Sequence, residues 1–157
     1  MRRNGGFASE YSAPQDSPGF LLWQATNRWQ AAQRAALKPF QLTHVQFVLL
    51  ASLTWLTTKG PVTQRQLADL AATDPMMTSQ VLRNLERRGL VKRAPDPSDG
   101  RARALTVTPS GRRLANRAVV AVEACDNAFF AALGKDKPHL IRALLSLRGN
   151  AQPSAPG

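Results

Sequence analysis

The chain has few of the residues that disulfide-bonded domains and metal sites need. It contains one cysteine, Cys125, and two histidines, His44 and His139, among 157 residues. A single cysteine excludes a disulfide within the chain and suits a reducing compartment, so we expect a cytoplasmic protein. Two distant histidines and one cysteine lack the ligand spacing of a zinc site, so we expect no metal and no cofactor.

Long apolar runs are also absent. No stretch of 18 or more apolar residues occurs, so we expect no membrane span, although 43% of the residues are hydrophobic and can form a core. The start, Met1-Arg2-Arg3, resembles a signal peptide but lacks its apolar region, so we interpret it as a tail. We find no paired nucleophile and base, phosphate-binding loop or metal cluster, and we expect no enzymatic activity.

Acidic residues are scarce: 10 Asp and Glu stand against 21 Lys and Arg, which gives a formal charge of +11. Such a charge attracts polyanions, but a soluble basic protein without a nucleic-acid partner has the same composition, so the distribution must decide. The charge is concentrated in one segment, where only Glu86, Asp96 and Asp99 oppose it. The basic residues of this segment are Arg83, Arg87, Arg88, Lys92, Arg93, Arg101, Arg103, Arg112 and Arg113.

Capping patterns predict a series of helices. Ser17, Thr43, Thr63, Asp74 and Thr108 each stand where a side-chain oxygen can accept a hydrogen bond from the first turn of a helix. The predicted helices run from 18 to about 37, from 43 to before Gly60-Pro61, over a short stretch after 63, from 75 to about 88, from 109 to an interruption at Gly134, and from about 136 to 147.

After Gly89 the spacing of apolar residues changes from that of a helix to that of a strand, which predicts a hairpin. Leu90-Val91-Lys92-Arg93 is short and extended, residues 95–100 are typical of a turn, and Arg103, Leu105 and Val107 alternate with smaller residues. Two short helices followed by a basic hairpin are the order of a winged helix-turn-helix, in which the second helix enters the DNA major groove. The fold class is therefore mainly α with a small β-hairpin wing.

The helix after Asp74 carries the candidate DNA-reading residues. Thr78, Val81, Leu82 and Leu85 lie on one face, and the polar residues lie off it. Gln80 can pair with adenine, and Arg83 can reach guanine or a phosphate. The candidate DNA-binding residues, with Met77 at the helix start and two arginines of the hairpin, are Met77, Ser79, Gln80, Arg83, Arg87, Arg101 and Arg103. A solvated helix face and solvated loop charges are the alternatives.

Five short motifs lie between about Leu42 and Gly111. They are Gln66-Leu67-Ala68, Val81-Leu82-Arg83-Asn84-Leu85-Glu86-Arg87-Arg88-Gly89-Leu90-Val91, Asp96-Pro97-Ser98-Asp99-Gly100-Arg101, Leu105-Thr106-Val107-Thr108-Pro109-Ser110-Gly111 and Leu42-Thr43-His44-Val45-Gln46-Phe47. Through these motifs the segment resembles the MarR family of regulators. One departure is Gly100, which stands where the family often has a basic residue, so the wing tip is expected to attract phosphate less strongly.

The resemblance implies a homodimer that reads an inverted repeat in double-stranded DNA, with the first and the last two helices at the dimer interface. It also implies that Asp99 orients Arg101, which enters the minor groove. The family binds its ligand between the dimer helices and the winged domain, where Trp29 and His44 are candidates for an effector pocket and a small aromatic effector is expected. Aromatic residues at helical spacing, Trp23 and Trp55 included, are more often core residues. Cys125 lies on an apolar stripe, which favours a buried residue over a redox sensor.

These observations predict one domain with two tails. Residues 1–16 form a disordered tail, 17–148 a single MarR-like domain and 149–157 a flexible tail. The winged helix-turn-helix spans about 43–108, and the dimerisation helices span about 17–38 and 109–148. The predicted function is a sequence-specific transcriptional regulator, a ligand-responsive repressor that binds its operator as a homodimer. The alternative is an architectural or nonspecific DNA-binding protein, which uses the charge without reading bases.

Overall fold

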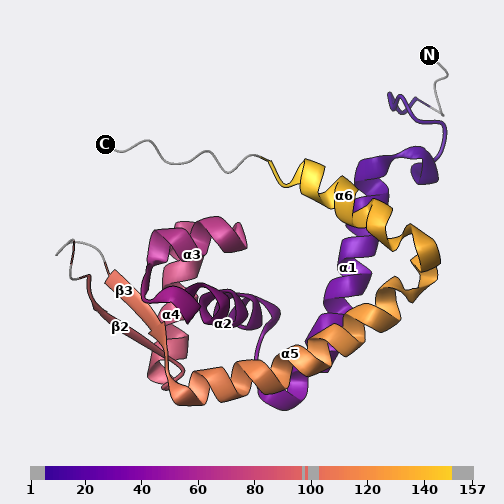
Figure 1. The fold of residues 1–157 in the computed structure, drawn as a ribbon. Helices are drawn as coiled ribbons and strands as arrows, with labels where there is room; N and C mark the ends of the chain where they lie inside the picture. Colours follow the sequence, from indigo (N-terminus) through magenta and orange to yellow (C-terminus); the bar gives the residue numbers. More distant parts are fainter. Residues whose placement is uncertain (1–5, 97, 99–102, 150–157) are drawn as a thin grey trace.

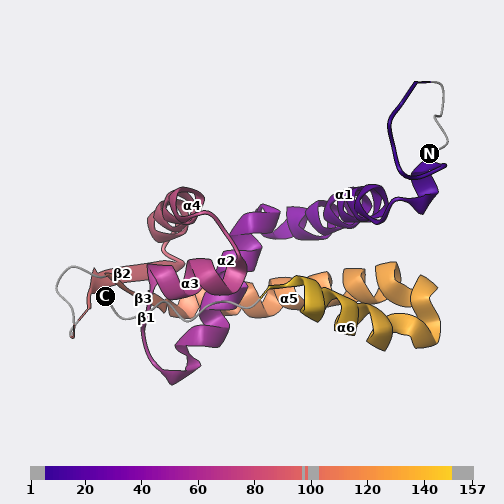
Figure 2. The same cartoon turned by 90° about the horizontal axis from the view of Figure 1, so that it is seen from above.

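The computed structural model describes residues 6–96, 98 and 103–149 and divides them into a winged part and a helical part (Figure 1). The winged part holds α2, α3, α4 and the β-sheet, and the helical part holds α6 with most of α1 and α5. Seen from above, α1 and α5 run beside each other away from the winged part (Figure 2). No helix in the described part of the chain is long and apolar enough to cross a membrane.

The described residues form six α-helices, five of which begin where the capping patterns predict a start. They are α1 (Pro18–Leu37), α2 (His44–Leu56), α3 (Gln64–Ala71), α4 (Pro75–Arg87), α5 (Pro109–Phe130) and α6 (Lys137–Leu147). Each of the five expected caps accepts a hydrogen bond from a first-turn amide, so the predicted starts are confirmed. Short 3-10 turns fill the remaining links: η1 (Pro14–Asp16), η2 (Lys38–Phe40), η3 (Thr57–Lys59) and η4 (Ala131–Asp136). Gly134 interrupts η4 with a φ of 52°, as the sequence predicted.

The sheet has three antiparallel strands in the order β1-β3-β2. The strands are β1 (Val62–Thr63), β2 (Val91–Pro95) and β3 (Arg103–Val107). The predicted hairpin is β2 with β3, which pair from Val91 opposite Val107 to Pro95 opposite Arg103. β1 was not predicted, because a strand of two residues is too short to show an alternating pattern. This strand pairs Val62 with Leu105, so it joins the entrance of α3 to the wing.

A leucine-rich core holds α4 in place. Leu49, Leu50 and Leu53 of α2 are fully buried, and α3, α4, β3 and α5 pack around them. The apolar residues contributed by these elements are Leu67, Leu82, Leu85, Leu105, Ala115, Ala118 and Val122. Phe47, Leu50, Leu53 and Leu56 recur at the spacing of one helical face, and α2 also buries Leu49, which lies outside that face. A helix surrounded on several sides has no need of one apolar face.

The helical part leaves apolar side chains exposed. The apolar residues of α1 recur at helical spacing from Leu22 to Ala36, which indicates one apolar face, but within the described chain α1 fully buries only Gln33 and Leu37. Leu22 is 54% exposed, and no residue of α6 is buried. α1 therefore packs on the rest of the chain through its C-terminal half, where Trp29, Ala32 and Ala36 are half-buried, and its N-terminal half stays exposed.

Candidate nucleic-acid interface and adjoining pocket

α4 has one buried and one exposed face, as the sequence predicted. Thr78, Leu82 and Leu85 are buried, whereas Gln80, Arg83 and Arg87 are exposed. Met77 is 44% exposed at the helix start, and Ser79 is half-buried. The exposed face carries hydrogen-bonding and cationic side chains at helical spacing, which is the chemistry that reads the edges and phosphates of a DNA groove.

The first turn of α4 is held by the loop that precedes it. Ala72, at the end of α3, adopts a left-handed φ of 51°, and this turn sets the angle between the two helices. The Thr78 hydroxyl donates to the carbonyl oxygen of Asp74 at 2.8 Å and lies 2.7 Å from the Thr73 hydroxyl. Because the only proton of the Thr78 hydroxyl goes to Asp74, the Thr73 hydroxyl is the donor in the second bond.

The last turns of α4 are held by the start of α2. Gln46 Nε2 donates to Asn84 Oδ1 at 3.0 Å, and Arg88 Nη1 donates to the carbonyl oxygen of Gln41 at 3.0 Å. Gln46 also completes the capping box of α2, because its Oε1 accepts from the backbone N–H of Thr43. The side chains of Asn84 and Arg88 therefore form hydrogen bonds within the protein and do not extend only into solvent.

The described residues include only part of the wing. Asp99 and Arg101, the predicted wing pair, lie outside the described residues, and for Arg103 the structure describes only the backbone, in β3. On β2, Arg93 Nε lies 3.6 Å from Glu86 Oε2, so an ion pair joins the wing to α4. Arg93 Nε and Nη2 are buried without a hydrogen-bond acceptor among the described residues.

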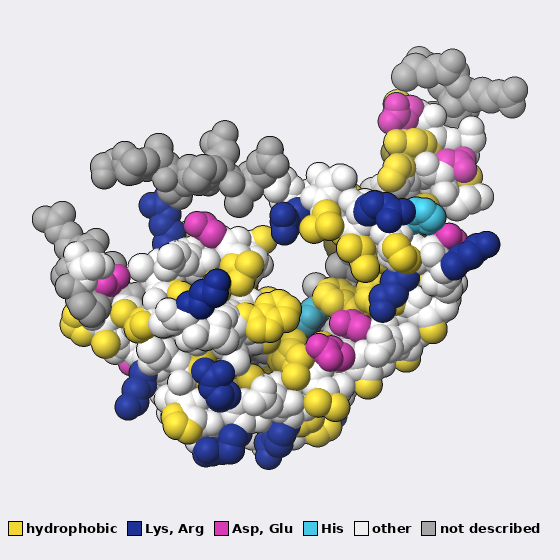
Figure 3. All heavy atoms as spheres, in the orientation of Figure 1, with side chains coloured by type: hydrophobic (Ala, Val, Ile, Leu, Met, Phe, Trp, Pro, Cys, Tyr) yellow, Lys and Arg dark blue, Asp and Glu magenta, His cyan; other side chains and the backbone are white. Residues whose placement is uncertain are grey.

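Charge is unevenly spread over the molecule (Figure 3). Lys and Arg side chains follow the lower edge of the winged part, where α5 begins, and apolar side chains gather on the inner side of the helical part. Nothing in the described segments groups three or more His, Cys, Asp or Glu side chains closely enough to hold a metal ion. On the face shown in Figure 3, the molecule therefore presents a basic surface on the winged part and an apolar surface on the helical part.

Trp29 and His44, the two predicted pocket residues, are brought together. Their ring centroids lie 4.9 Å apart at 72°, an edge-to-face contact between α1 and the first residue of α2. Both line a pocket of about 350 Å³ at the junction of the two parts. Its other walls come from Gln30, Arg34, Val45, Val48, Ala71 and Thr73.

A polar cluster lies beside this pocket. Trp29 Nε1 and Gln33 Nε2 both donate to Asp126 Oδ1, at 2.7 and 2.6 Å. Burial lowers the pKa of His44, Asp126 opposes that shift, and Arg34 lowers the pKa further. Gln33 Oε1 is buried without a partner in the described structure, so the cluster has unused acceptor capacity. Sequence reasoning missed Gln33 and Asp126, since neither stands in a recognisable motif.

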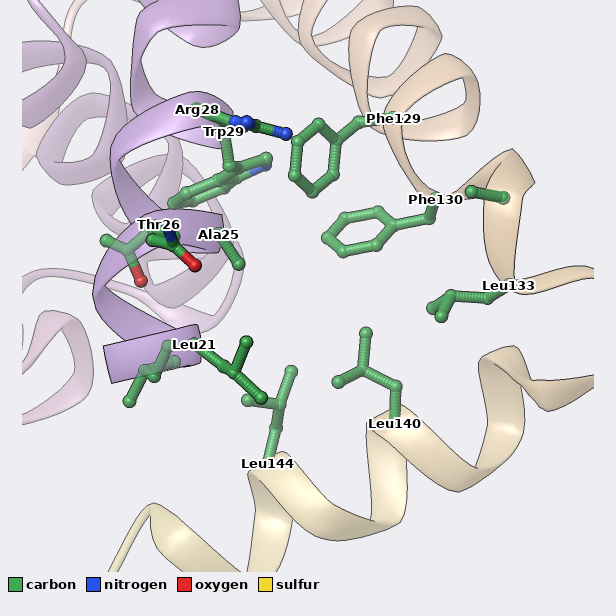
Figure 4. Close-up of a pocket in the computed structure, with 13 residues that line it drawn as sticks. Leu21, Ala25, Thr26, Arg28, Trp29, Phe129, Phe130, Leu133, Leu140 and Leu144 are labelled. Carbon is green, nitrogen blue, oxygen red and sulfur yellow. The ribbon is translucent and has the colours of Figure 1, made fainter. Parts of the chain in front are cut away.

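A second, larger hollow lies within the helical part (Figure 4). Leu21, Trp29, Phe130, Leu140 and Leu144 point toward a common space of about 700 Å³ between α1, the end of α5 and α6. Leu144 is 46% exposed. An apolar groove of this size, open to water in a single chain, is typical of a surface that a partner covers.

Two expectations about core residues are wrong. Trp23 and Trp55 are 66% and 77% exposed, so neither is a core residue. Neither lines the two hollows described above, so the structure gives them no part in an effector site. Cys125 is half-buried on α5 rather than fully buried, and the thiol is free.

Known proteins resemble the chain over most of its length. The profile of the MarR family matches residues 42–102. An uncharacterized HTH-type transcriptional regulator, YdcH of Bacillus subtilis, is 46% identical over 133 residues, which cover 84% of this chain and 90% of the relative. The crystal structure of CouR from Rhodococcus jostii bound to p-coumaroyl-CoA has a TM-score of 0.78 at 31% identity and covers 89% of this chain and 97% of CouR.

A second structure of the transcriptional repressor CouR is bound to a 23-mer DNA duplex. It has a TM-score of 0.74 at 27% identity and covers 88% of this chain and 98% of CouR. The winged part with its exposed α4, the flanking helices and these likenesses agree with one another. The chain belongs to the MarR family of helix-turn-helix transcriptional regulators.

Proposed function

We propose that this chain is a cytoplasmic, non-enzymatic transcriptional repressor that binds an inverted-repeat operator as a homodimer and releases it when a small aromatic effector binds. The observation that carries the proposal is the exposed face of α4, on which Gln80, Arg83 and Arg87 stand opposite the buried Leu82 and Leu85. A polar and basic face on a firmly packed helix is suited to base reading. The DNA-bound structure of the repressor CouR supports the assignment by analogy.

The homodimer is supported by the apolar groove of the helical part. Leu22 and Leu144 line this groove and are 54% and 46% exposed among the described residues, and Leu140 beside them is half-buried. Burying them against a second copy removes apolar area from water, and a two-fold dimer places two α4 helices for the two halves of an inverted repeat.

The effector is supported by the pocket that contains Trp29 and His44. A volume of about 350 Å³, two aromatic rings and a few polar side chains suit a small aromatic molecule. CouR was crystallised with p-coumaroyl-CoA, which carries such a group. A screen of small aromatic acids should give a compound that raises the melting temperature and releases the operator; a broad screen without such a compound would contradict ligand control.

Base reading is tested with two substitutions of different kinds. The operator is first selected from random DNA, and each variant is then titrated against the operator and a scrambled duplex at several salt concentrations. Gln80→Ala should weaken operator binding by roughly 1–3 kcal/mol with little change in salt dependence, because a base contact is lost. Arg101→Ala should weaken binding to both duplexes and reduce the salt slope by roughly one, because a contact with the negative groove is lost.

The matched control for the loss of charge is Lys135→Ala, which removes one positive charge from η4 in the helical part. It should leave affinity and salt slope near those of the unmodified protein. If Arg101→Ala behaves like this control, the wing does not contact DNA. If Gln80→Ala weakens both duplexes equally, that side chain does not read a base and the architectural alternative gains support.

A further inference from the structure

Both ends of α4 are fastened to segments that also form the wall of the Trp29–His44 pocket. At the start of α4, Thr78 is bonded to Thr73, and Thr73 lines the pocket. Near its end, Asn84 is bonded to Gln46, which lies in the same first turn of α2 as His44 and Val45, two further pocket residues. The reading helix and the pocket therefore share two short segments, residues 71–73 and 44–46.

These bonds have the features of positioning contacts. Thr78 is fully buried, and Asn84 and Gln46 are half-buried, so water does not freely replace their partners. Asn84 follows Gln80 by one helical turn, so a bond to Asn84 fixes the rotation of the face that carries Gln80 and Arg83. A rotation or shift of this face by an ångström or two would misplace every base contact at once.

We infer that Gln46 and Thr73 are positioning residues for DNA reading, and that they are the two points through which occupancy of the Trp29–His44 pocket reaches α4. This inference rests on the proposed function as a ligand-controlled DNA reader. A ligand that pushes apart the wall segments binds better to the state in which α4 is misplaced, and its differential affinity for the two states sets the loss of operator binding. The link is a pair of hydrogen bonds rather than a general loosening of the core.

The α2 contact is tested by Gln46→Met, which keeps the length of the side chain and removes the bond to Asn84. Operator affinity should fall roughly three- to tenfold, the range of one lost hydrogen bond. The ratio of operator to scrambled-duplex affinity should fall with it, while the salt slope stays unchanged. Gln46→Glu should restore the ratio, because a carboxylate accepts from the Thr43 amide and from the Asn84 side-chain amide after that amide turns over.

The control for loss of the capping box is Gln66→Met. Gln66 forms the same box with Thr63 at the start of α3, and the structure shows no bond from it to α4. Gln66→Met should lower the melting temperature about as much as Gln46→Met does. It should leave the ratio of operator affinity to scrambled-duplex affinity unchanged. If Gln46→Met and Gln66→Met change the ratio equally, or if neither changes it, Gln46 is not a positioning residue.

The α3–α4 contact is tested in parallel by Thr73→Val, which should lower the same ratio, and by Thr73→Ser, which should restore it. Thr58→Val is the control, because Thr58 makes one local bond, to the carbonyl oxygen of Trp55, at an exposed site. A ratio that stays at the level of the unmodified protein in Thr73→Val would overturn this half of the inference.

The effect of pocket occupancy on α4 is tested without an effector, by a substitution in α1 that fills the pocket. Gln30 lines the pocket and belongs to the helical part, so Gln30→Phe adds an aromatic ring without altering the winged part. It should lower operator affinity about tenfold, and it should have a much smaller effect when Gln46→Met and Thr73→Val are already present, because coupled sites are not additive. An undiminished effect in the combined variant, or no effect in either background, would overturn the coupling.

These outcomes are separable from failure of the proposed function. If the unmodified protein does not distinguish its selected operator from a scrambled duplex, the proposed function fails before any variant is compared. If it does distinguish them and the Gln46 and Thr73 variants do so equally well, only the inference fails.

Discussion

His44 packs against a neighbouring helix and also has a pKa that the fold shifts. It is the first residue of α2, its ring packs edge-on against Trp29, and it faces Arg34 and Asp126. Burial is the largest influence on its ionisation and favours the neutral ring. The sequence indicated Trp29 and His44 as candidates, but Asp126, whose carboxylate accepts from Trp29, lies 97 residues further along the chain and could be found only in the folded protein.

The lowered pKa of His44 predicts a pH dependence of stability. In the unfolded chain the histidine takes up a proton near its ordinary pKa of 6.5, and in the folded protein it does so only at lower pH. Stability should therefore be constant above about pH 7 and should fall as the pH drops through 6.5, until His44 is protonated in the folded state as well.

The measurement is denaturant unfolding of the unmodified protein and of His44→Phe across this pH range. His44→Phe keeps a ring against Trp29 and cannot be protonated, so its stability should fall less between about pH 7 and 5. The same fall in both proteins would show that His44 does not carry the effect.

At the level of the elements, the close fit between α5 and the wing depends on Gly111. This residue is buried in the first turn of α5, directly after the Thr108 cap. A Cβ at this position would overlap the backbone carbonyl of Leu90 and lie 2.9 Å from Val107 Cγ1. The first turn of α5 therefore packs closely against the base of the hairpin at Gly111.

Gly111→Ala should destabilise the protein by about 3 kcal/mol, since the carbonyl group of Leu90 that the Cβ would overlap belongs to the backbone and cannot rotate away as a side chain can. The matched control is Gly19→Ala in α1, where an added Cβ meets no atom within 4 Å. The control should be neutral or stabilising by up to about 1 kcal/mol, because alanine favours a helix. Thermal and denaturant unfolding of both variants is the measurement, and equal stability of the two would contradict the packing argument.

At the level of the whole molecule, the two parts differ in how complete their packing is. The winged part closes around the leucines of α2, whereas the helical part leaves its groove open. Leu140 and Leu144 of α6 lie opposite Leu21, Ala25 and Trp29 of α1 in this groove (Figure 4). The helical part is therefore completed by a second copy in the proposed dimer.

Leu144→Glu should weaken dimerisation by roughly 100-fold or more, because the interface would bury an unpaired carboxylate. Deletion from Asp136 onward removes α6 and should have the same consequence, together with loss of operator binding. The control is Trp55→Gln at a site that is 77% exposed in the winged part. Analytical ultracentrifugation distinguishes monomer from dimer, and a Leu144→Glu protein that still sediments as a dimer at micromolar concentration would refute this role of α6.

Local chemistry in the sequence was enough to predict the order of the helices, the five capped starts, the hairpin and the two faces of α4. Caps and apolar periods act within one or two turns, so they can be read without knowledge of the fold. The family motif depends on the same short spacings. The predicted contact of Arg101 with DNA, and the orientation of Arg101 by Asp99, stay predictions because both residues lie outside the described part of the chain.

Only the tertiary structure decided which surfaces are buried and which distant residues meet. The exposed Trp23 and Trp55, the two-residue strand β1 and the left-handed Ala72 all follow from packing between elements rather than from local preference. The same holds for the bonds from Gln46 to Asn84 and from Trp29 to Asp126, which join segments 38 and 97 residues apart. Burial and hydrogen bonding depend on distances in space, and a linear pattern specifies those distances only where neighbouring residues set them.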